Sequence, residues 1–274
     1  MKKNNQQVKL VQQFYDENTQ LEWERLDRRP IEFSIAKSYL SRYINSGDKV
    51  LDLGGGPGRY ACWLASLGAH VTLADLSKNS ITFAKKKAKE LGHKINCYQL
   101  DARDLTPLKG KTFNHIILFG PLYHLLDVKD RQTVMENCLK LLKPGGKIYC
   151  TFISSYTSIM YYLKNEPERI LDESDFMKER LNAFIQDAPF SGQTFTQVHY
   201  TKKNEALDFM AQFPLEKNHF LGLEGMLAPF ESMTSTADEA VVNAWIDVAT
   251  KVCEHEDLIS WAEHFMYIGT KKLT

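Results

Sequence analysis

Short apolar runs alternate with helical patterns along much of the chain. The runs are rich in Val, Ile and Leu, and the fourth, FNHIILFG, is nearly continuous in apolar residues, as expected of a strand buried on both faces. Seven runs predict strands over residues 50–53, 71–75, 95–101, 113–120, 147–154, 219–223 and 264–269. Strands that alternate with helices are typical of parallel sheets with crossover helices. The sequence therefore predicts a doubly wound α/β fold with a seven-stranded, mostly parallel sheet.

Four segments differ in pattern. Residues 1–46 are helical in pattern and are expected to cover the sheet, residues 47–154 form the core, and residues 201–274 complete it. Residues 155–200 carry aromatic and charged side chains without strand alternation, so we expect a helical insertion after the fifth strand, either a lid or an interface. Pro57 suits the first turn of the helix after the first strand, and Ser77 suits the cap of the next helix.

Charge and cysteine content exclude several classes of protein. The 34 basic and 34 acidic side chains cancel, so no global field attracts nucleic acid or an anionic membrane. The five cysteines are far apart and form no C-x-x-C pair for zinc or redox chemistry. The N-terminus lacks the apolar run of a secretory signal, and no segment approaches the length of a membrane span. We expect a soluble cytoplasmic protein.

A glycine loop lies between the first predicted strand and the helix that follows it. The sequence is LDLGGGPGR, with four glycines, of which Gly54, Gly56 and Gly58 give the spacing G-x-G-x-G. Glycines let the backbone approach a ligand closely, and the helix N-terminus supplies free N–H groups. A dinucleotide fingerprint would require a third glycine where Arg59 stands, and Pro57 removes one amide donor. The spacing therefore argues against a dinucleotide.

Two carboxylates end the second and third predicted strands. Asp75 follows the glycine loop by about 20 residues, where an acidic side chain can accept hydrogen bonds from both hydroxyls of a ribose. Asp101 ends the third strand, where a carboxylate can accept from an exocyclic adenine amine. Together with the loop they predict a crevice for an adenosine-containing ligand at one edge of the sheet.

The stretch from about Val50 to Ser154 resembles the class I S-adenosylmethionine-dependent methyltransferases. VLDLGGGPGRY is similar to their first motif, VTLADLS to the second, QLDARDL to the third, and FNHIILFGPLYHLL to the region after the fourth strand, with KPGGKIY following. The order and spacing of these motifs carry the resemblance. The GPLYHL stretch is like that of a bacterial branch of small-molecule methyltransferases. The resemblance implies an enzyme that uses S-adenosylmethionine and releases S-adenosylhomocysteine.

The resemblance also implies roles for single residues. It places Gly54, Gly56 and Gly58 against the methionine part of the cofactor, Asp75 on the ribose, Leu76 on the adenine, Asp101 and Ala102 at the adenine edge, and Phe119 and Gly120 beside the sulfonium. Asp52 either orients the loop amides or reaches the ligand's amino group. Arg59 either pairs with the methionine carboxylate or lies on the outer face of its helix.

Tyr123 and His124 are the candidate catalytic residues, because they follow the fourth strand at the crevice edge where the methyl group points. An oxygen acceptor needs its proton removed, and His is the usual base near neutral pH. Lining the pocket is the alternative role for both residues. The other histidines lack metal-ligand spacing, so we expect no metal.

The neutral charge balance favours a small-molecule acceptor over nucleic acid. A tRNA or rRNA methyltransferase and a non-catalytic S-adenosylmethionine-binding protein stay open as alternatives. An aminopropyltransferase is disfavoured, because those enzymes resemble G-G-G-D-G and here Pro57 replaces the acid. The sequence does not identify the acceptor or the oligomeric state.

Overall fold

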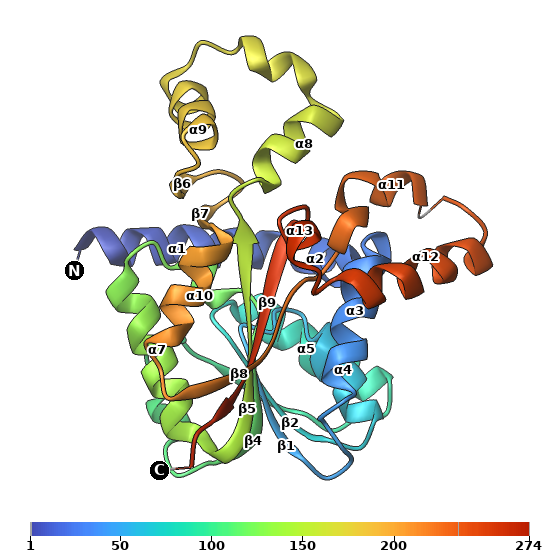
Figure 1. The fold of residues 1–274 in the computed structure, drawn as a ribbon. Helices are drawn as coiled ribbons and strands as arrows, with labels where there is room; N and C mark the ends of the chain where they lie inside the picture. The colour runs from blue at the N-terminus through green and yellow to red at the C-terminus, as the bar shows by residue number, and fades with distance from the viewer. Residues whose placement is uncertain (1, 235, 274) are drawn as a thin grey trace.

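One sheet forms the centre of the computed structural model, which describes residues 2–234 and 236–273 (Figure 1). Within those ranges the sheet has nine strands. They are β1 (Lys49–Leu53), β2 (His70–Asp75), β3 (Asn96–Gln99), β4 (Phe113–Leu118), β5 (Leu142–Ser154), β6 (Phe190–Gln193), β7 (Gln197–Thr201), β8 (Leu215–Gly222) and β9 (His264–Lys271). The order begins β3-β2-β1-β4-β5, all parallel. β9 pairs antiparallel with β5, and β8 pairs antiparallel with β9.

The seven strands expected from the apolar runs are all present, so the doubly wound, mostly parallel sheet is confirmed. Their boundaries shift by a few residues at most, except at β5. This strand begins at Leu142 and includes the KPGG segment, where its register with β4 shifts between Phe113 and His115. The KPGG segment, which precedes the strand expected over residues 147–154, is therefore an irregular start to that strand.

The expectation of a purely helical insertion over residues 155–200 is wrong in its last part. Residues 190–201 form the hairpin of β6 and β7, and β7 pairs with the end of β5 at Ile153 and Ser154. β5 runs past the last residue of β4, which pairs with Cys150. The backbone groups of β5 beyond that point need partners, and β7 supplies them.

Helices cover both faces of the sheet (Figure 1). Those that follow the strands of the core are α4 (Arg59–Ser66), α5 (Lys78–Glu90), η1 (Thr106–Leu108), α6 (Pro121–His124), α7 (Val128–Leu141), α10 (Lys203–Ala211), η3 (Gly225–Phe230), α11 (Glu231–Thr234), α12 (Glu239–Val252) and α13 (Glu256–Ile259). None of the helices in the described ranges is long and apolar enough to cross a bilayer.

Two apolar cores lie on opposite faces of the sheet. Strand alternation sends Leu51 to one core, with α7 and α10, and Val50 to the other, with α3 and α4. β4 divides in the same way, with Ile116 in the first core and Ile117 in the second. All four of these side chains are fully buried. The central strands are therefore apolar on both faces, which explains why their sequences lack a polar alternation.

Of the three N-terminal helices, α1 (Lys2–Glu17) and α2 (Thr19–Arg28) lie at the carboxyl ends of the parallel strands, and α3 (Pro30–Leu40) runs down one face of the sheet beside α4. We call the three helices the N-terminal cover. Asp16 of α1 accepts a hydrogen bond from the Ser77 hydroxyl at the start of α5, 2.6 Å away. Asp27 of α2 pairs with Arg59 of α4. The cover is thus attached to the two helices that follow the first two strands.

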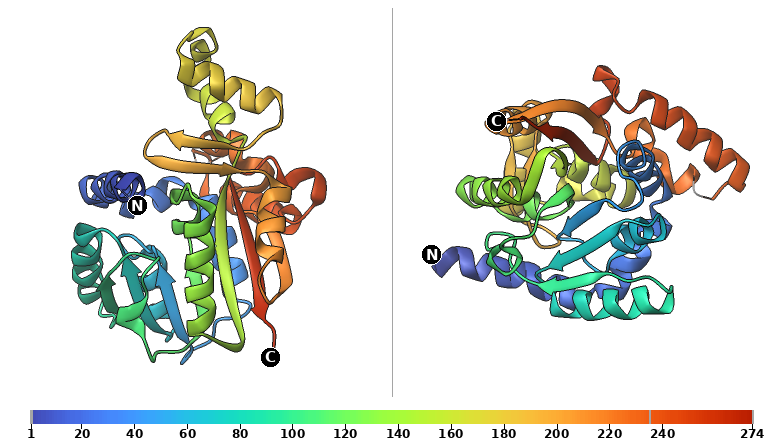
Figure 2. Two further views of the ribbon diagram at one scale, coloured as in Figure 1. Left: turned by 90° about the vertical axis from the view of Figure 1, so that its left-hand side faces the viewer. Right: turned by 90° about the horizontal axis from the view of Figure 1, so that it is seen from below.

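The segment between β5 and β7 projects beyond the sheet as a separate lobe (Figure 2). It contains α8 (Thr157–Asn165), η2 (Pro167–Leu171) and α9 (Asp175–Ile185), followed by the β6–β7 hairpin. We call residues 155–201 the upper lobe. It lies at the same edge of the sheet as the N-terminal cover, so these two additions border one region.

The glycine loop ends in a residue with a left-handed backbone. Gly58 has φ +88° and precedes α4, which begins at Arg59 rather than at Pro57 as expected. A Cβ at Gly58 would lie 3.0 Å from the Cβ of Ala84 on α5. Gly47 has φ +87°, but a Cβ there would meet no atom within 4 Å.

These two glycines separate backbone strain from packing. Gly47→Ala should lower the free energy of unfolding by about 1 to 2 kcal/mol through strain alone. Gly58→Ala should cost about 1 to 3 kcal/mol more, because its methyl group also presses on Ala84. Urea unfolding of both variants measures the difference, and equal losses would show that α4 and α5 separate without cost.

Candidate functional site

A cavity of about 930 Å³ lies at the carboxyl ends of the parallel strands. The glycine loop and the ends of β1, β2 and β4 form one side. The N-terminal cover and the upper lobe form the rest, with aromatic residues from both: Tyr15, Tyr161, Tyr162, Phe176, Phe195 and Tyr200. A cavity of this size is at the upper end of the range for small-ligand sites, so it has room for more than one small molecule.

The glycine loop contacts the cavity through only part of its length. Gly54 and Gly56 line it, and a Cβ on Gly56 would project into open space. A Cβ on Gly54 would lie 2.5 Å from the ring of Pro121. Gly58 is not among the lining residues, because it packs against α5. Gly54 and Gly56 therefore line the cavity, and at Gly56 the missing side chain leaves open space.

Two carboxylates at the ends of β1 and β2 are buried beside the loop. Asp75 accepts hydrogen bonds from the amides of Gly56 and Ser77, both at 2.8 Å, and burial raises its pKa to about 6. Neither carboxylate oxygen of Asp52 has a hydrogen-bond partner among the described residues. Burial and the charge of Asp75 raise the pKa of Asp52 to about 7, against a smaller opposing effect of the Ala61 backbone.

A buried carboxylate without a partner is costly. Asp52 lines the cavity, so a positively charged ligand group would relieve this cost. S-adenosylmethionine carries an ammonium and a sulfonium. The residues present therefore fit the ligand that the resemblance implies, and the orphaned oxygens of Asp52 are the observation that supports the fit.

The third strand brings Asp101 and Ala102 to the cavity, and Leu76 lines it from the end of β2. The Asp101 carboxylate is already paired with Arg103, whose Nη2 lies 2.7 Å from Oδ2. Arg103 also pairs with Asp130 at 3.0 Å. Any contact of Asp101 with an adenine amine would use the remaining lone pairs of a carboxylate that Arg103 holds in place.

Phe119 and Gly120 follow β4 and both line the cavity. The ring of Phe119 packs edge-on against Tyr60, with centroids 5.1 Å apart. Gly120 has φ +132° and leads directly into α6. This turn directs Tyr123 and His124 into the region where the fourth-strand motif predicted them.

Arg59 lines the cavity, and its guanidinium also contacts the N-terminal cover. Its guanidinium makes two hydrogen bonds to Asp27, at 2.6 and 3.1 Å, and lies over the rings of Trp23 and Phe33. Arg59 joins the helix after the glycine loop to the N-terminal cover.

His124 is buried with both ring nitrogens engaged. Nδ1 donates to the carbonyl of Gln197 at 2.9 Å, so Nε2 of the neutral ring accepts from the Tyr15 hydroxyl at 2.7 Å. Burial lowers its pKa to about 4. The neighbouring Tyr123 also lines the cavity, and burial raises its pKa. A proton could reach His124 only through the hydroxyl of Tyr15.

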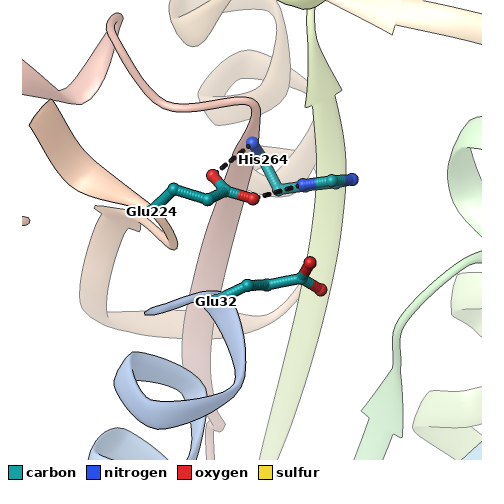
Figure 3. A group of neighbouring side chains, drawn as sticks. All are labelled: Glu32, Glu224 and His264. Carbon is teal, nitrogen blue, oxygen red and sulfur yellow. Dashed lines mark hydrogen bonds and ion pairs between the residues drawn. The ribbon is translucent and has the colours of Figure 1, made fainter. Parts of the chain in front are cut away.

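A second histidine, which sequence reasoning did not select, is arranged differently (Figure 3). His264 begins β9 and lines the cavity. Glu224 is fully buried behind it and accepts from both the His264 amide, at 2.9 Å, and its Nδ1, at 2.6 Å. This double contact fixes the ring and leaves Nε2 on the edge away from Glu224. No local pattern indicated the pair, because 40 residues separate its members.

Several charged groups surround His264. Burial disfavours its charged form, but the carboxylates of Glu224 and Glu32 outweigh this effect and Arg25, so the pKa of His264 is raised. Glu263 also interacts with His264. Glu32, Glu224 and His264 are close enough to hold a cation. However, Arg25 binds both oxygens of Glu32, and His264 binds both of Glu224. These contacts favour a hydrogen-bonded group over a metal site.

The parallel sheet, the glycine loop and the carboxylate at the end of β2 together define a protein that binds a nucleoside-containing ligand.

A family described as "Methyltransferase domain" matches residues 50–146. "Ubiquinone biosynthesis O-methyltransferase" of Vibrio parahaemolyticus is 30% identical over 169 residues, which are 58% of this chain and 71% of that protein. The Photobacterium profundum protein of that name is 27% identical over 185 residues, 64% of this chain and 72% of its own.

Solved structures share the fold. An S-adenosylmethionine-dependent methyltransferase from Clostridium acetobutylicum superimposes with a TM-score of 0.60 at 11% identity, covering 94% of this chain and 99% of its own. Magnesium protoporphyrin IX methyltransferase from Synechocystis, crystallised with S-adenosylhomocysteine, gives 0.59 at 12% identity, covering 97% and 100%. The chain belongs to the class I S-adenosylmethionine-dependent methyltransferases. It is an enzyme, and S-adenosylmethionine is its methyl donor.

The two cavity histidines should titrate in opposite directions. We expect the imidazole of His264 to have a pKa above the ordinary value and that of His124 to have a pKa near 4, as their surroundings dictate. NMR titration of the ring protons measures both, with His264→Gln and His124→Gln to assign the signals. Glu224→Gln should lower the pKa of His264 and leave His124 unchanged. A normal pKa for both rings would contradict the arrangement.

Proposed function

We propose that the protein transfers the methyl group of S-adenosylmethionine to a hydroxyl oxygen of a small, partly apolar acceptor. The observation that carries this proposal is one cavity that joins the glycine loop to the His264–Glu224 pair beneath the N-terminal cover and the upper lobe. Enclosure excludes water and aligns the acceptor with the donor, which is most of what such a displacement requires.

The charge of the cavity supports a small acceptor over RNA. Six arginines and seven carboxylates line it, so no basic rim is present among the described residues. Arg25, Arg29 and Arg59 each form an ion pair with a carboxylate. RNA binding would instead need unpaired cations around an open mouth. The two named relatives carry "O-methyltransferase" in their names, which agrees with an oxygen acceptor.

The motif positions suggest which residues hold S-adenosylmethionine, and we call this part of the cavity the donor half. We assign Gly54, Gly56 and Asp52 to the methionine part, Asp75 to the ribose hydroxyls, and Leu76, Asp101 and Ala102 to the adenine. Phe119 and Gly120 then lie near the sulfonium. The Asp75 oxygens already hold Gly56 and Ser77, and each oxygen retains a lone pair for a hydroxyl.

His264 is better placed than His124 to act as the base for the acceptor hydroxyl. S-adenosylmethionine supplies a methyl group activated by the positive sulfur. The acceptor oxygen forms the new C–O bond as the C–S bond breaks, the bonding pair stays on sulfur, and the hydroxyl proton passes to Nε2 of neutral His264. Glu224 holds the ring and stabilises the imidazolium. Tyr123 and His124 shape the pocket, with Tyr15 fixed by His124. It stays a prediction that the chain belongs to the bacterial branch of small-molecule methyltransferases that carries the GPLYHL stretch.

The donor half can be tested by removing one charge. Asp75→Asn should weaken binding of S-adenosylhomocysteine about 10- to 100-fold, because it removes a charge-assisted acceptor from the ribose. Asp104→Asn is the matched control, since this carboxylate ends the same motif, is exposed and does not line the cavity. Calorimetry measures both. Unchanged affinity with a lower melting temperature would limit Asp75 to holding Gly56 and Ser77.

The acceptor half can be tested with labelled donor. We expect transfer of label from S-adenosylmethionine to one or more of a panel of phenols and catechols, with a rate that rises with pH as His264 loses its proton. His264→Gln should lower this rate about 10²- to 10⁴-fold without weakening binding of S-adenosylhomocysteine. Label in tRNA, with binding that weakens as salt rises, would favour RNA methylation. Donor binding without any transfer would favour a non-catalytic binding protein.

A further inference from the structure

Arg180 is a buried cation in the wall of the cavity. It belongs to α9 of the upper lobe, lines the cavity, and is 3% exposed. Its guanidinium carbon lies 4.3 Å from the ring centroid of Tyr200 and 4.7 Å from that of Phe190, with Phe176 at 5.8 Å. These three rings fix the plane of the guanidinium and separate it from solvent.

The polar edge of Arg180 has no partner that would account for its burial. Nε and Nη1 are both buried and form no hydrogen bond with the described residues. Within the same ranges no carboxylate forms an ion pair with Arg180, whereas the cavity residues Arg25, Arg29, Arg59 and Arg169 each have one. A buried charge without a counter-ion is strongly unfavourable. Stacking on rings offsets only part of this cost.

Strand register connects Arg180 to the proposed base. Ile153 of β5 pairs with His264 of β9 on one side and with Tyr200 of β7 on the other. Tyr200 in turn pairs with Phe190 of β6. Residues in such a row share one face of a sheet, and His264, Ile153 and Tyr200 all line the cavity. Neighbouring strands are about 4.8 Å apart, so the row places Tyr200 about 10 Å from His264 along the cavity wall.

We propose that Arg180 binds a carboxylate of the methyl acceptor, which is therefore a small hydroxy acid with its hydroxyl group at His264. This inference rests on the proposed function and names its substrate class. One arginine matches the single charge and the planar, two-oxygen geometry of a carboxylate. The backbones of His264 and Tyr200 are about 10 Å apart, and the ring of Tyr200 stacks on Arg180. The side chains of His264 and Arg180 fill part of this distance, and the space left between them suits one aromatic ring that carries the hydroxyl and the carboxylate. The aromatic side chains around Arg180 and the apolar side chain of Ile153 would pack against this ring of the acceptor.

The test compares acids with their neutral esters. With S-adenosylhomocysteine present, calorimetry measures the binding of 3,4-dihydroxybenzoate and 4-hydroxycinnamate and of the methyl ester of each. We expect at least one acid to bind wild-type protein about 10- to 100-fold more tightly than its ester. Arg180→Gln should abolish this preference, and Arg180→Lys should restore it only in part, because lysine keeps the charge but loses the planar fork.

Arg169→Gln is the matched control. Arg169 lines the same cavity from the upper lobe, but it is paired with Glu166 and Asp172, so its loss should leave the preference for the acid intact. Affinity for S-adenosylhomocysteine should be unchanged in all three variants, which separates this inference from the donor site. Equal binding of acid and ester, no binding of either acid at millimolar concentration, or a preference that survives Arg180→Gln would overturn the assignment. The wild-type comparison stands even if Arg180→Gln fails to fold.

Discussion

The carboxylate of Asp75 holds together the parts of the molecule that meet at the carboxyl ends of the strands. One oxygen accepts from the amide of Gly56 in the glycine loop, and the other accepts from the amide of Ser77 at the start of α5. The Ser77 hydroxyl caps α5 through the Ser80 amide and donates to Asp16 of the N-terminal cover. Loop, helix and cover therefore share one fixed point. Burial raises the pKa of Asp75 and of the neighbouring Asp52, so a cationic donor bound at this edge would stabilise the charged form of both carboxyls.

Ion pairs between elements, as well as apolar packing, hold the wall of the cavity together. Arg29 of the N-terminal cover reaches Glu263, which precedes β9, at 2.6 Å. Arg25 binds Glu32 within the cover and lowers the pKa of that buried carboxyl to about 2. Each pair neutralises a charge in the cavity wall, so the field inside arises from the few groups without counter-ions. Asp52 near the donor edge and Arg180 in the upper lobe are two such groups, and they have opposite signs.

The two cavity histidines show how surroundings divide one side-chain type into two roles. The neighbours of His124 are a carbonyl and a hydroxyl, which hold a neutral ring. His264 has a carboxylate behind Nδ1 and a second carboxylate nearby, which favour a charged ring. Both lie in the same cavity, so position alone did not distinguish them. The partner of Nδ1 did, because a carboxylate stabilises the imidazolium and a carbonyl does so far less.

The sequence by itself determined the seven strands, the glycine loop, Asp75 at the end of β2 and the cap at Ser77, because each is encoded by residues within one turn or one strand. It did not determine the β6–β7 hairpin, whose strand β7 forms because β5 extends past β4. It also left the partner of Arg59 open, since Asp27 lies 32 residues away on another helix. The His264–Glu224 pair depends on the pairing of β8 with β9, and the setting of Arg180 depends on the register of β5, β7 and β6. Only tertiary structure decides such contacts, because their partners are brought together by the packing of distant segments and carry no periodic or local signal in the chain.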